Sequence, residues 1–375
     1  MKLLEYLALP FTEPNRKQSS HGESLLVLDG LRGLAVLVVI ASHTSAFGMY
    51  GQGSLGVLMF FFLSGFVLTV PYANDPARLF RGNELFRFSA NRVLRIVPIY
   101  VVSVVFIAWL LEANFNWILA HVVFYKGWNH LWSVAEEARF YLLFPIVVGA
   151  LVLIRWEWLK LPLLALLIYF AYRYQHYHTI DLFDGRFVSF YFWMFLGGVL
   201  TCLLYKSSLV RNLANLPHVP SLLGLSAVVV MACLFFSSDY MIAYFWRPLI
   251  PSLPENLILN GWRMPGAWFF MFLVLFYSVT TFQRNLASRF LQHFFFRHMG
   301  LLSYSLYLFH MPIFLELRKF GFQQEGMFFA TFALTYVVAL ASYVLIEKPF
   351  LMLKPKGRKA RAARESGAAS AAGQS

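Results

Sequence analysis

The chain has 375 residues, of which 59% are hydrophobic and 13% charged, and its formal net charge is +13. Soluble domains average about 25% charged residues, so this composition excludes an ordinary soluble protein and is typical of an integral membrane protein. The basic residues are spread over loops and a tail and form no single cluster, which excludes nucleic acid as a partner.

Apolar runs of about 20 residues recur along the whole chain, and runs of this length predict transmembrane helices. Membrane-spanning strands would instead alternate over about ten residues. We therefore expect an all-α integral membrane protein with about ten transmembrane helices in one bundle. The Gly197-Gly198 pair in the sixth span predicts a close contact with another helix. The expected spans are 25–46, 55–73, 95–113, 131–154, 161–173, 187–205, 221–238, 263–282, 299–317 and 327–347.

Three ionisable residues interrupt the first span, and charges inside a membrane helix are costly enough to need a reason. Asp29 precedes Arg32 by three residues, which lets their side chains pair on one helix face. His43 follows Arg32 by eleven residues. At about 100° per residue the two side chains return to the same face, about 16 Å apart along the axis. Either this face is functional, or the ionisable residues simply mark the two membrane surfaces.

Two arginines, Arg92 and Arg95, stand at the start of the third span and project from one side of a helix. A guanidinium group offers a fixed fork of donors that suits phosphate, so the pair is a candidate phosphate clamp. The plainer interpretation is ordinary positive charge at the cytoplasmic end of a span.

Ionisable residues also occur in the later spans. The fourth begins with Glu136 and Glu137, followed by Arg139. Adjacent residues on a helix point about 100° apart, so only one carboxylate faces a given site, and the other is expected to pair with Arg139 or with a neighbouring helix. The ninth span carries His310, for which a packed, hydrogen-bonded role and a functional role are both open. Glu347 is expected to mark the cytoplasmic end of the last span.

Basic residues are unequally divided between the alternating connecting segments. The basic-rich set includes 74–94, 206–220, 283–298 and the C-terminal tail. The positive-inside rule places this set in the cytoplasm. Both termini are then expected to be cytoplasmic, with Arg32 toward the inner face of the membrane and His43 toward the outer face.

These patterns divide the chain into three parts. Residues 1–24 are expected to form a cytoplasmic N-terminal segment, because they lack the pattern of a signal peptide. Residues 25–350 are expected to form the transmembrane domain. Residues 351–375 are rich in basic residues and lack apolar periodicity, so we expect a disordered cytoplasmic tail that contacts anionic lipid.

These stretches together resemble the acyltransferase 3 family of membrane acyltransferases, over about residues 25–350. The motifs that carry the resemblance are Leu28-Asp-Gly-Leu-Arg-Gly with His43, Phe60-Phe-Phe-Leu-Ser-Gly-Phe66, Arg92-Val-Leu-Arg95, His130-Leu-Trp-Ser with Glu137, Ser303-Tyr-Ser-Leu-Tyr-Leu-Phe-His310 and Ile346-Glu-Lys-Pro-Phe350. Each motif is weak alone, but their joint occurrence in this order is specific. The fourth-span motif departs from the family pattern. Glu137 takes the place of the first glutamate, while Glu136, Ala138 and Arg139 replace the usual valine, second glutamate and glutamine.

The resemblance implies transfer of an acyl group, usually acetyl, from cytoplasmic acyl-CoA to a hydroxyl of a lipid-linked or extracytoplasmic glycan, in the bacterial cytoplasmic (inner) membrane. It implies His43 and Glu137 as catalytic residues. His43 would be the general base or a transient acyl carrier, and Glu137 would orient it or bind the sugar. Arg32, Arg92 and Arg95 would bind the acyl-CoA or stabilise developing charge. The supporting residues are Asp29, Trp132, Ser133, Tyr141 and His310.

The expected partners are acyl-CoA as co-substrate (acetyl-CoA in the first place), a glycan or lipid-linked sugar acceptor, and membrane lipid. No bound cofactor and no metal are expected, and the acyl chain, the acceptor hydroxyl and the oligomeric state stay open. A proton-coupled transporter of a small polar solute or an acyl group is the main alternative, since ionisable residues within a helix bundle also form proton paths. However, the paired interrupted helices or internal repeat of many transporters are not visible. A third alternative is a non-catalytic subunit of a glycan-synthesis complex.

Overall fold

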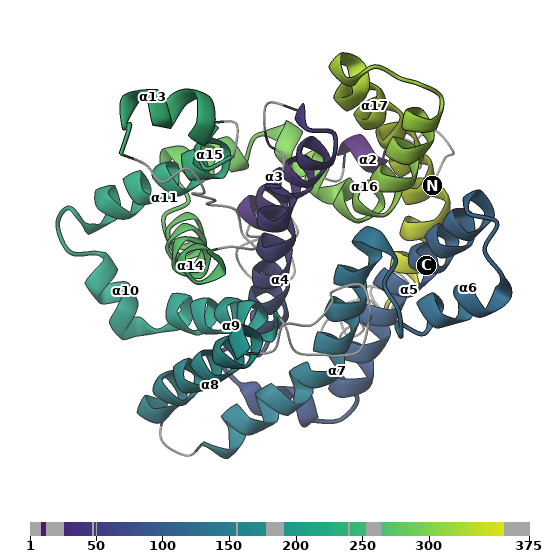
Figure 1. The fold of residues 1–375 in the computed structure, drawn as a ribbon. Coiled ribbons are helices and arrows are strands. Elements are labelled where there is room, and N and C mark those ends of the chain that lie inside the picture. Colours follow the sequence, from purple (N-terminus) through teal and green to yellow (C-terminus); the bar gives the residue numbers. More distant parts are fainter. Residues whose placement is uncertain are drawn as a thin grey trace, which may run out of the picture.

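In the computed structural model, every regular element of the described residues is a helix. The described residues are 9–12, 26–46, 49, 51–154, 157–177, 191–238, 241–252 and 264–355. The helices stand around a central pair, α3 (Leu26–His43) and α4 (Gly53–Thr69), as Figure 1 shows. The expectation of an all-α protein is confirmed for this part of the chain.

A helix lies at the position of each predicted span. Besides α3 and α4, these are α5 (Glu84–Leu110), α7 (Trp132–Leu153), α8 (Glu157–Tyr177), α9 (Phe192–Lys206), α11 (Val219–Phe236), α14 (Pro265–Thr281), α16 (Phe294–Lys319) and α17 (Gln324–Ser342). Short helical elements lie between or beside them: α2 (Leu9–Thr12), η3 (Pro76–Phe80), α6 (Phe115–Val122), η4 (Asn129–Leu131), α10 (Ser208–Ala214), η5 (Ile242–Trp246), α13 (Arg247–Leu249), α15 (Leu286–Leu291), η6 (Tyr343–Glu347) and α18 (Lys348–Met352).

Fewer helices than predicted are long and apolar enough to cross a membrane. Among the described residues five segments qualify by length and composition: Leu26–His43, Glu84–Leu110, Val219–Phe236, Phe294–Lys319 and Gly326–Met352. The helices α4, α9 and α14 are apolar but have only 10–17 residues. The first turns of α7 carry the charges of Glu136, Glu137 and Arg139. The structure therefore supports an all-helical membrane protein, while the count of about ten spans stays a prediction.

The centre of the bundle is α3, which packs against α4 on one side and α16 on the other (Figure 1). Of its 18 residues, 13 are buried. The apolar sequence between Arg32 and His43 contains no proline, so the helix is continuous between them. The Arg32 and His43 side chains therefore project from one continuous helix, about 16 Å apart along its axis.

Glycines let α3 and α16 approach backbone to backbone. A Cβ atom on Gly300 of α16 would lie 1.8 Å from the carbonyl oxygen of Asp29. A Cβ atom on Gly33 of α3 would lie 2.0 Å from the carbonyl oxygen of Phe296. Close approach of this kind needs small residues at the helix interface. The glycines of the first-span motif thus hold α16 against the helix that carries the candidate site.

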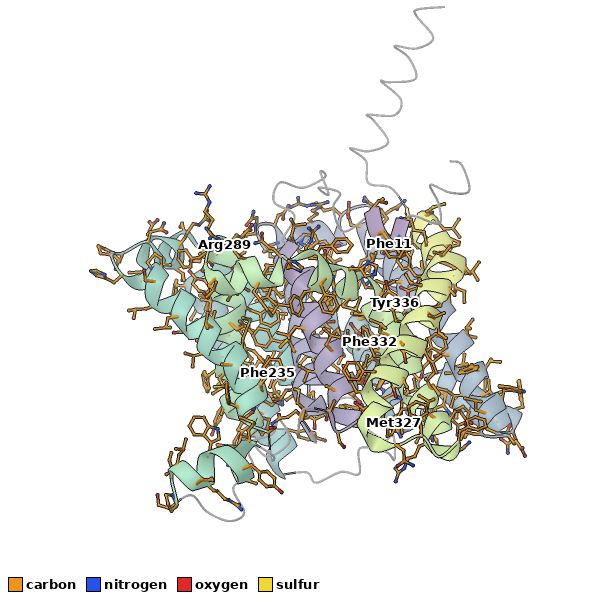
Figure 2. The ribbon with its side chains drawn as sticks, turned by 90° about the horizontal axis from the view of Figure 1, so that it is seen from above. Phe11, Phe235, Arg289, Met327, Phe332 and Tyr336 are labelled. Atoms are coloured by element: carbon orange, nitrogen blue, oxygen red, sulfur yellow. The ribbon has the colours of Figure 1, made fainter. Side chains whose placement is uncertain are left out.

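Figure 2 shows the two ends of the bundle, with Phe11 and Arg289 near one end and Met327 near the other. Phe11 stacks on His298 of α16 with ring centroids 5.2 Å apart, and His298 Nδ1 donates to the Pro10 carbonyl oxygen over 2.9 Å. These contacts fix α2 against the bundle. Most of the predicted segment 1–24, and the predicted tail from residue 356 onward, lie outside the described residues.

Candidate active site

A pocket inside the bundle gathers most of the site residues predicted from the sequence. Its wall comes from α3, α4, α5, α7 and α16, which are widely separated along the chain. The predicted residues that line it are Arg32, Arg92, Arg95, Ser133, Glu137 and Tyr141. Polar residues not predicted from the sequence complete this part of the wall: Ser64, Ser303, Tyr304 and Tyr307. Apolar side chains of α4, such as Phe60 and Leu63, form another part.

The pocket holds more positive than negative charge. Arg32 donates to Asp29 over 3.0 Å, so the pairing predicted from their spacing is confirmed. Arg92 and Arg95, three residues apart on α5, have no carboxylate oxygen within 4 Å among the described residues. Half-buried cations without a counter-ion are costly, so this arrangement favours an anionic ligand.

The positive charge of the pocket extends to the end of the last helix. Burial, together with the charges of Arg95, Arg92 and Arg32, lowers the pKa of Lys354 to about 7. The Arg92 guanidinium carbon lies 5.6 Å from the centroid of the Tyr141 ring, which holds it at the pocket wall. A ligand with several negative charges would relieve the repulsion among these cations.

Glu137 is held in the pocket by two hydroxyl groups. Ser64 Oγ of α4 donates to Glu137 Oε1 over 2.5 Å, and the hydroxyl of Tyr141, one turn along α7, donates to the same oxygen. The other carboxylate oxygen, Oε2, accepts no hydrogen bond from the described residues, so a substrate hydroxyl can donate to it. Within the same part of the chain no hydrogen bond joins Glu137 to His43.

The neighbouring glutamate has a different partner. Arg139 donates to Glu136 over 2.6 Å and to the carbonyl oxygen of Phe124 over 2.9 Å. These contacts tie α7 to the segment that follows α6. The sequence left two possible partners, Arg139 or a neighbouring helix, for the glutamate that does not face the site. The pairing of Glu136 with Arg139 is the one confirmed. Glu137 is thus the glutamate that faces the pocket.

Three histidines meet at the end of α3. His43 Nδ1 lies 3.1 Å from Nε2 of His310, and the two ring centroids are 5.0 Å apart. The His130 ring lies edge-on to His310, also at 5.0 Å between centroids. His130 and His310 are buried, whereas His43 is partly exposed. The structure therefore pairs His43 with His310, a residue that the sequence placed only among the supporting ones.

One side chain separates this histidine cluster from the pocket. Tyr307 lines the pocket, and its ring lies 5.6 Å from that of His310 and 5.5 Å from that of His130. Its hydroxyl lies 2.6 Å from Ser133 Oγ, which also lines the pocket. The cationic pocket and the histidine cluster are therefore neighbouring parts of one site.

The remaining predicted site residues lie around these two parts. Trp132 packs against Phe61 with ring centroids 5.9 Å apart and is not part of the pocket wall. Asp29 is outside the wall as well and touches the site through Arg32. Among the described residues, no group of three or more histidine, cysteine, aspartate or glutamate side chains has the arrangement of a metal site.

Sequence reasoning missed the role of Glu347 in the fold. It is only 3% exposed, and the hydroxyl of Ser305 on α16 donates to it. Glu347 is therefore not an exposed surface charge, because it joins the single-turn π-helix η6 to α16, and its place at the cytoplasmic end of the last span stays a prediction. The serine and tyrosine spacing of the ninth-span motif was the available signal, because Ser305 stands between Tyr304 and Tyr307 of the pocket wall.

Comparison with known proteins adds an independent observation. A family model described as an acyltransferase domain, Acyl_transf_3, matches residues 25–347. The chain is 28% identical to a Komagataeibacter xylinus protein named as the membrane-bound transacylase BcsY, over 91% of this chain and 86% of that protein. It is 27% identical to the O-acetyltransferase OatA of Staphylococcus aureus, over 89% of this chain but only 58% of OatA. No solved structure matches the chain.

Proposed function

The chain belongs to the acyltransferase 3 family and is a membrane acyltransferase, and we propose that it transfers an acetyl group from acetyl-CoA to a hydroxyl of a lipid-linked or extracytoplasmic glycan. The observation that carries the proposal is that Arg92 and Arg95, which have no carboxylate partner among the described residues, lie in one site with a histidine pair. A polyanionic donor and a hydroxyl acceptor need these two kinds of group. Family membership decides between the classes left open by the sequence, since it favours an enzyme over a transporter or a non-catalytic subunit.

The donor binds through its phosphate groups. Arg92 and Arg95 supply forked donors that suit phosphate oxygens, and Arg32 adds positive charge further into the bundle. The positive-inside rule assigns this end of the site to the cytoplasm, where acyl-CoA is made. The thioester arm then runs along the apolar wall of α4 toward the histidine cluster. We place the protein in the bacterial cytoplasmic membrane, with both termini in the cytoplasm.

His43 acts as the general base. Its Nε2 takes the proton of the acceptor hydroxyl while the hydroxyl oxygen attacks the carbonyl carbon of the thioester. A C–O bond forms, the C–S bond breaks, and the leaving thiolate takes the proton from His43. The products are an O-acetyl ester and free CoA thiol, and His43 returns to its starting form. A histidine suits this cycle because its ordinary pKa lies near neutrality.

Glu137 binds the sugar in this account. Its Oε1 is occupied by the hydroxyls of Ser64 and Tyr141, and its Oε2 accepts a hydroxyl of the acceptor. The sequence also left open that Glu137 orients His43, but His43 is hydrogen-bonded to His310. Glu137 thus orients the acceptor, and the imidazole of His43 activates it.

The proposed function is tested with purified protein in nanodiscs, given radiolabelled acetyl-CoA and an extract of lipid-linked glycans. We expect release of CoA thiol that depends on the extract, together with label in the glycan fraction. A transporter would instead carry label across a vesicle membrane without thiol release. Binding of acetyl-CoA with neither thiol release nor labelled glycan would contradict the proposal.

We expect loss of either pocket arginine to weaken donor binding. In Arg95→Ala or Arg92→Ala, the KM for acetyl-CoA should rise about 10–100-fold, because a charge-assisted hydrogen bond contributes about 1.5–3 kcal/mol. The control is Arg81→Ala, which removes an exposed arginine paired with Asp75 over 2.8 Å. Initial rates at varied acetyl-CoA give KM and kcat separately. An unchanged KM in both pocket variants would argue against a phosphate clamp.

A further inference from the structure

We propose that His310 is a positioning residue that fixes the tautomer of His43, so that Nδ1 of His43 carries the proton and Nε2 carries the free lone pair. The inference rests on the proposed function, in which that lone pair takes the proton of the acceptor. It follows from a chain of three groups whose donor and acceptor roles are determined at one end by a backbone carbonyl.

The series of hydrogen bonds begins in α16. His310 Nδ1 lies 2.6 Å from the carbonyl oxygen of Tyr307, one turn earlier in the same helix. A carbonyl oxygen accepts hydrogen bonds and donates none, so Nδ1 of His310 must carry the proton. A neutral imidazole has one protonated nitrogen, which leaves Nε2 of His310 with a lone pair. His310 is 0% exposed, and a buried imidazole without a carboxylate partner is neutral.

The second step crosses from α16 to α3. His310 Nε2 lies 3.1 Å from Nδ1 of His43. Because Nε2 of His310 is an acceptor, Nδ1 of His43 must be the donor. Nε2 of His43 is consequently unprotonated.

Contacts with neighbouring elements hold the helix turn that carries His310 in place. The hydroxyl of Tyr307 donates to the carbonyl oxygen of His130 over 2.9 Å, and Nε2 of His130 donates to the carbonyl oxygen of Leu308 over 3.0 Å. These two contacts join η4, which directly precedes α7, to the turn of α16 that carries His310. The close approach of α3 and α16 at Gly300 fixes the distance between the helices. The turn of α16 that carries His310 is therefore held against both η4 and α3.

A second histidine is suited to this role. Among the described residues, the titratable side chains whose rings contact His310 are His43, His130 and Tyr307, and none of them is a carboxylate. An imidazole acceptor fixes the tautomer without adding a negative charge to a membrane-buried site, where charges are costly. When the orienting partner of a catalytic histidine fails to hold the right tautomer, turnover falls by up to about 10⁴-fold. His310 is buried, whereas His43 beside it is partly exposed. In our proposal the acceptor reaches Nε2 of His43 from this exposed side.

The kinetic test compares two substitutions of His310. His310→Phe keeps an aromatic ring but removes the acceptor, and we expect kcat to fall about 100-fold or more with KM for acetyl-CoA unchanged. His310→Gln places an amide oxygen near the former Nε2, and we expect it to recover at least tenfold of that loss. His298→Phe is the matched control, because His298 is a buried α16 histidine bonded to Tyr336 and the Pro10 carbonyl, away from the site. It should keep the kcat of the wild type.

The tautomer itself is read by nitrogen NMR of histidine-labelled protein in nanodiscs, with the His43 signals identified by their loss in His43→Gln. We expect a protonated Nδ1 and an unprotonated Nε2 in the wild type, and a shift toward the opposite tautomer in His310→Phe. An unprotonated Nδ1 in the wild type would overturn the inference, as would full activity of His310→Phe. Neither result would touch the proposed acyl transfer itself, which fails only if the wild-type protein transfers no acyl group.

Discussion

His43→Ala is expected to lower kcat for acetyl transfer by about 10²–10⁴-fold, the usual contribution of a positioned general base. The neighbouring histidines are poor substitutes, because an acceptor cannot reach their rings as it reaches that of His43. His310 is 0% exposed and His130 is 3% exposed, whereas His43 is partly exposed. KM for acetyl-CoA should change little, since the donor is held by Arg92 and Arg95 of α5 and by Arg32, which lies about 16 Å from His43 along α3. Initial-rate kinetics on purified variants measure both constants.

The control for this substitution is His293→Ala. His293 caps the start of α16 through a hydrogen bond from the Phe295 backbone amide and lies outside the site. It should keep the wild-type kcat, at a cost of about 1 kcal/mol in stability from the lost cap. Equal activity of His43→Ala and wild type would remove His43 from the mechanism. Added imidazole should restore part of the activity of His43→Ala, because a small base can occupy the vacated space.

The largest effect on stability is expected for Gly300→Ala. Its new Cβ would lie 1.8 Å from the Asp29 carbonyl oxygen, so α3 and α16 must separate. Backbone atoms cannot yield as a flexible side chain does, and we expect a loss of about 3 kcal/mol or more. The melting temperature of the protein in detergent should fall by several degrees, with activity lost in parallel, because the separation also pulls His310 from His43.

Gly149→Ala provides the comparison at another helical glycine. A Cβ atom there would meet only the Phe80 ring, at 3.4 Å, which is ordinary contact. Alanine is the better helix former, so this variant should melt at or above the temperature of the wild type. A melting temperature of Gly300→Ala equal to that of Gly149→Ala would show that the two helices do not touch as described.

Sequence reasoning was most successful where chemistry depends on spacing within one helix. The Asp29–Arg32 pair, the Glu136–Arg139 pair and the shared side of Arg92 and Arg95 all follow from three-residue spacing. The Gly197-Gly198 pair also behaves as expected. A Cβ atom on Gly198 would lie 1.9 Å from the carbonyl oxygen of Phe62, so that close contact is confirmed. These relations need only the geometry of a single helix or the size of one side chain.

Contacts between helices that are far apart along the chain could not be predicted from the sequence. His43 and His310 are 267 residues apart, and nothing in either motif says that their helices are neighbours. The burial of Glu347 depends in the same way on Ser305 of another helix. The span count stays a prediction for a different reason, since hydropathy does not show where an apolar helix becomes too short to cross a membrane. The partner of His43 depends on which helices pack together, and a single motif does not carry that information.

The most direct test of the central claim is mass spectrometry of surface glycans and lipid-linked precursors. Three strains are compared, with wild-type protein, with the gene deleted, and with His43→Ala at wild-type abundance. We predict that one acetyl-sized increment is present on a glycan of the wild-type strain and missing from both of the others. An unchanged set of acyl groups in the deletion strain would contradict the account.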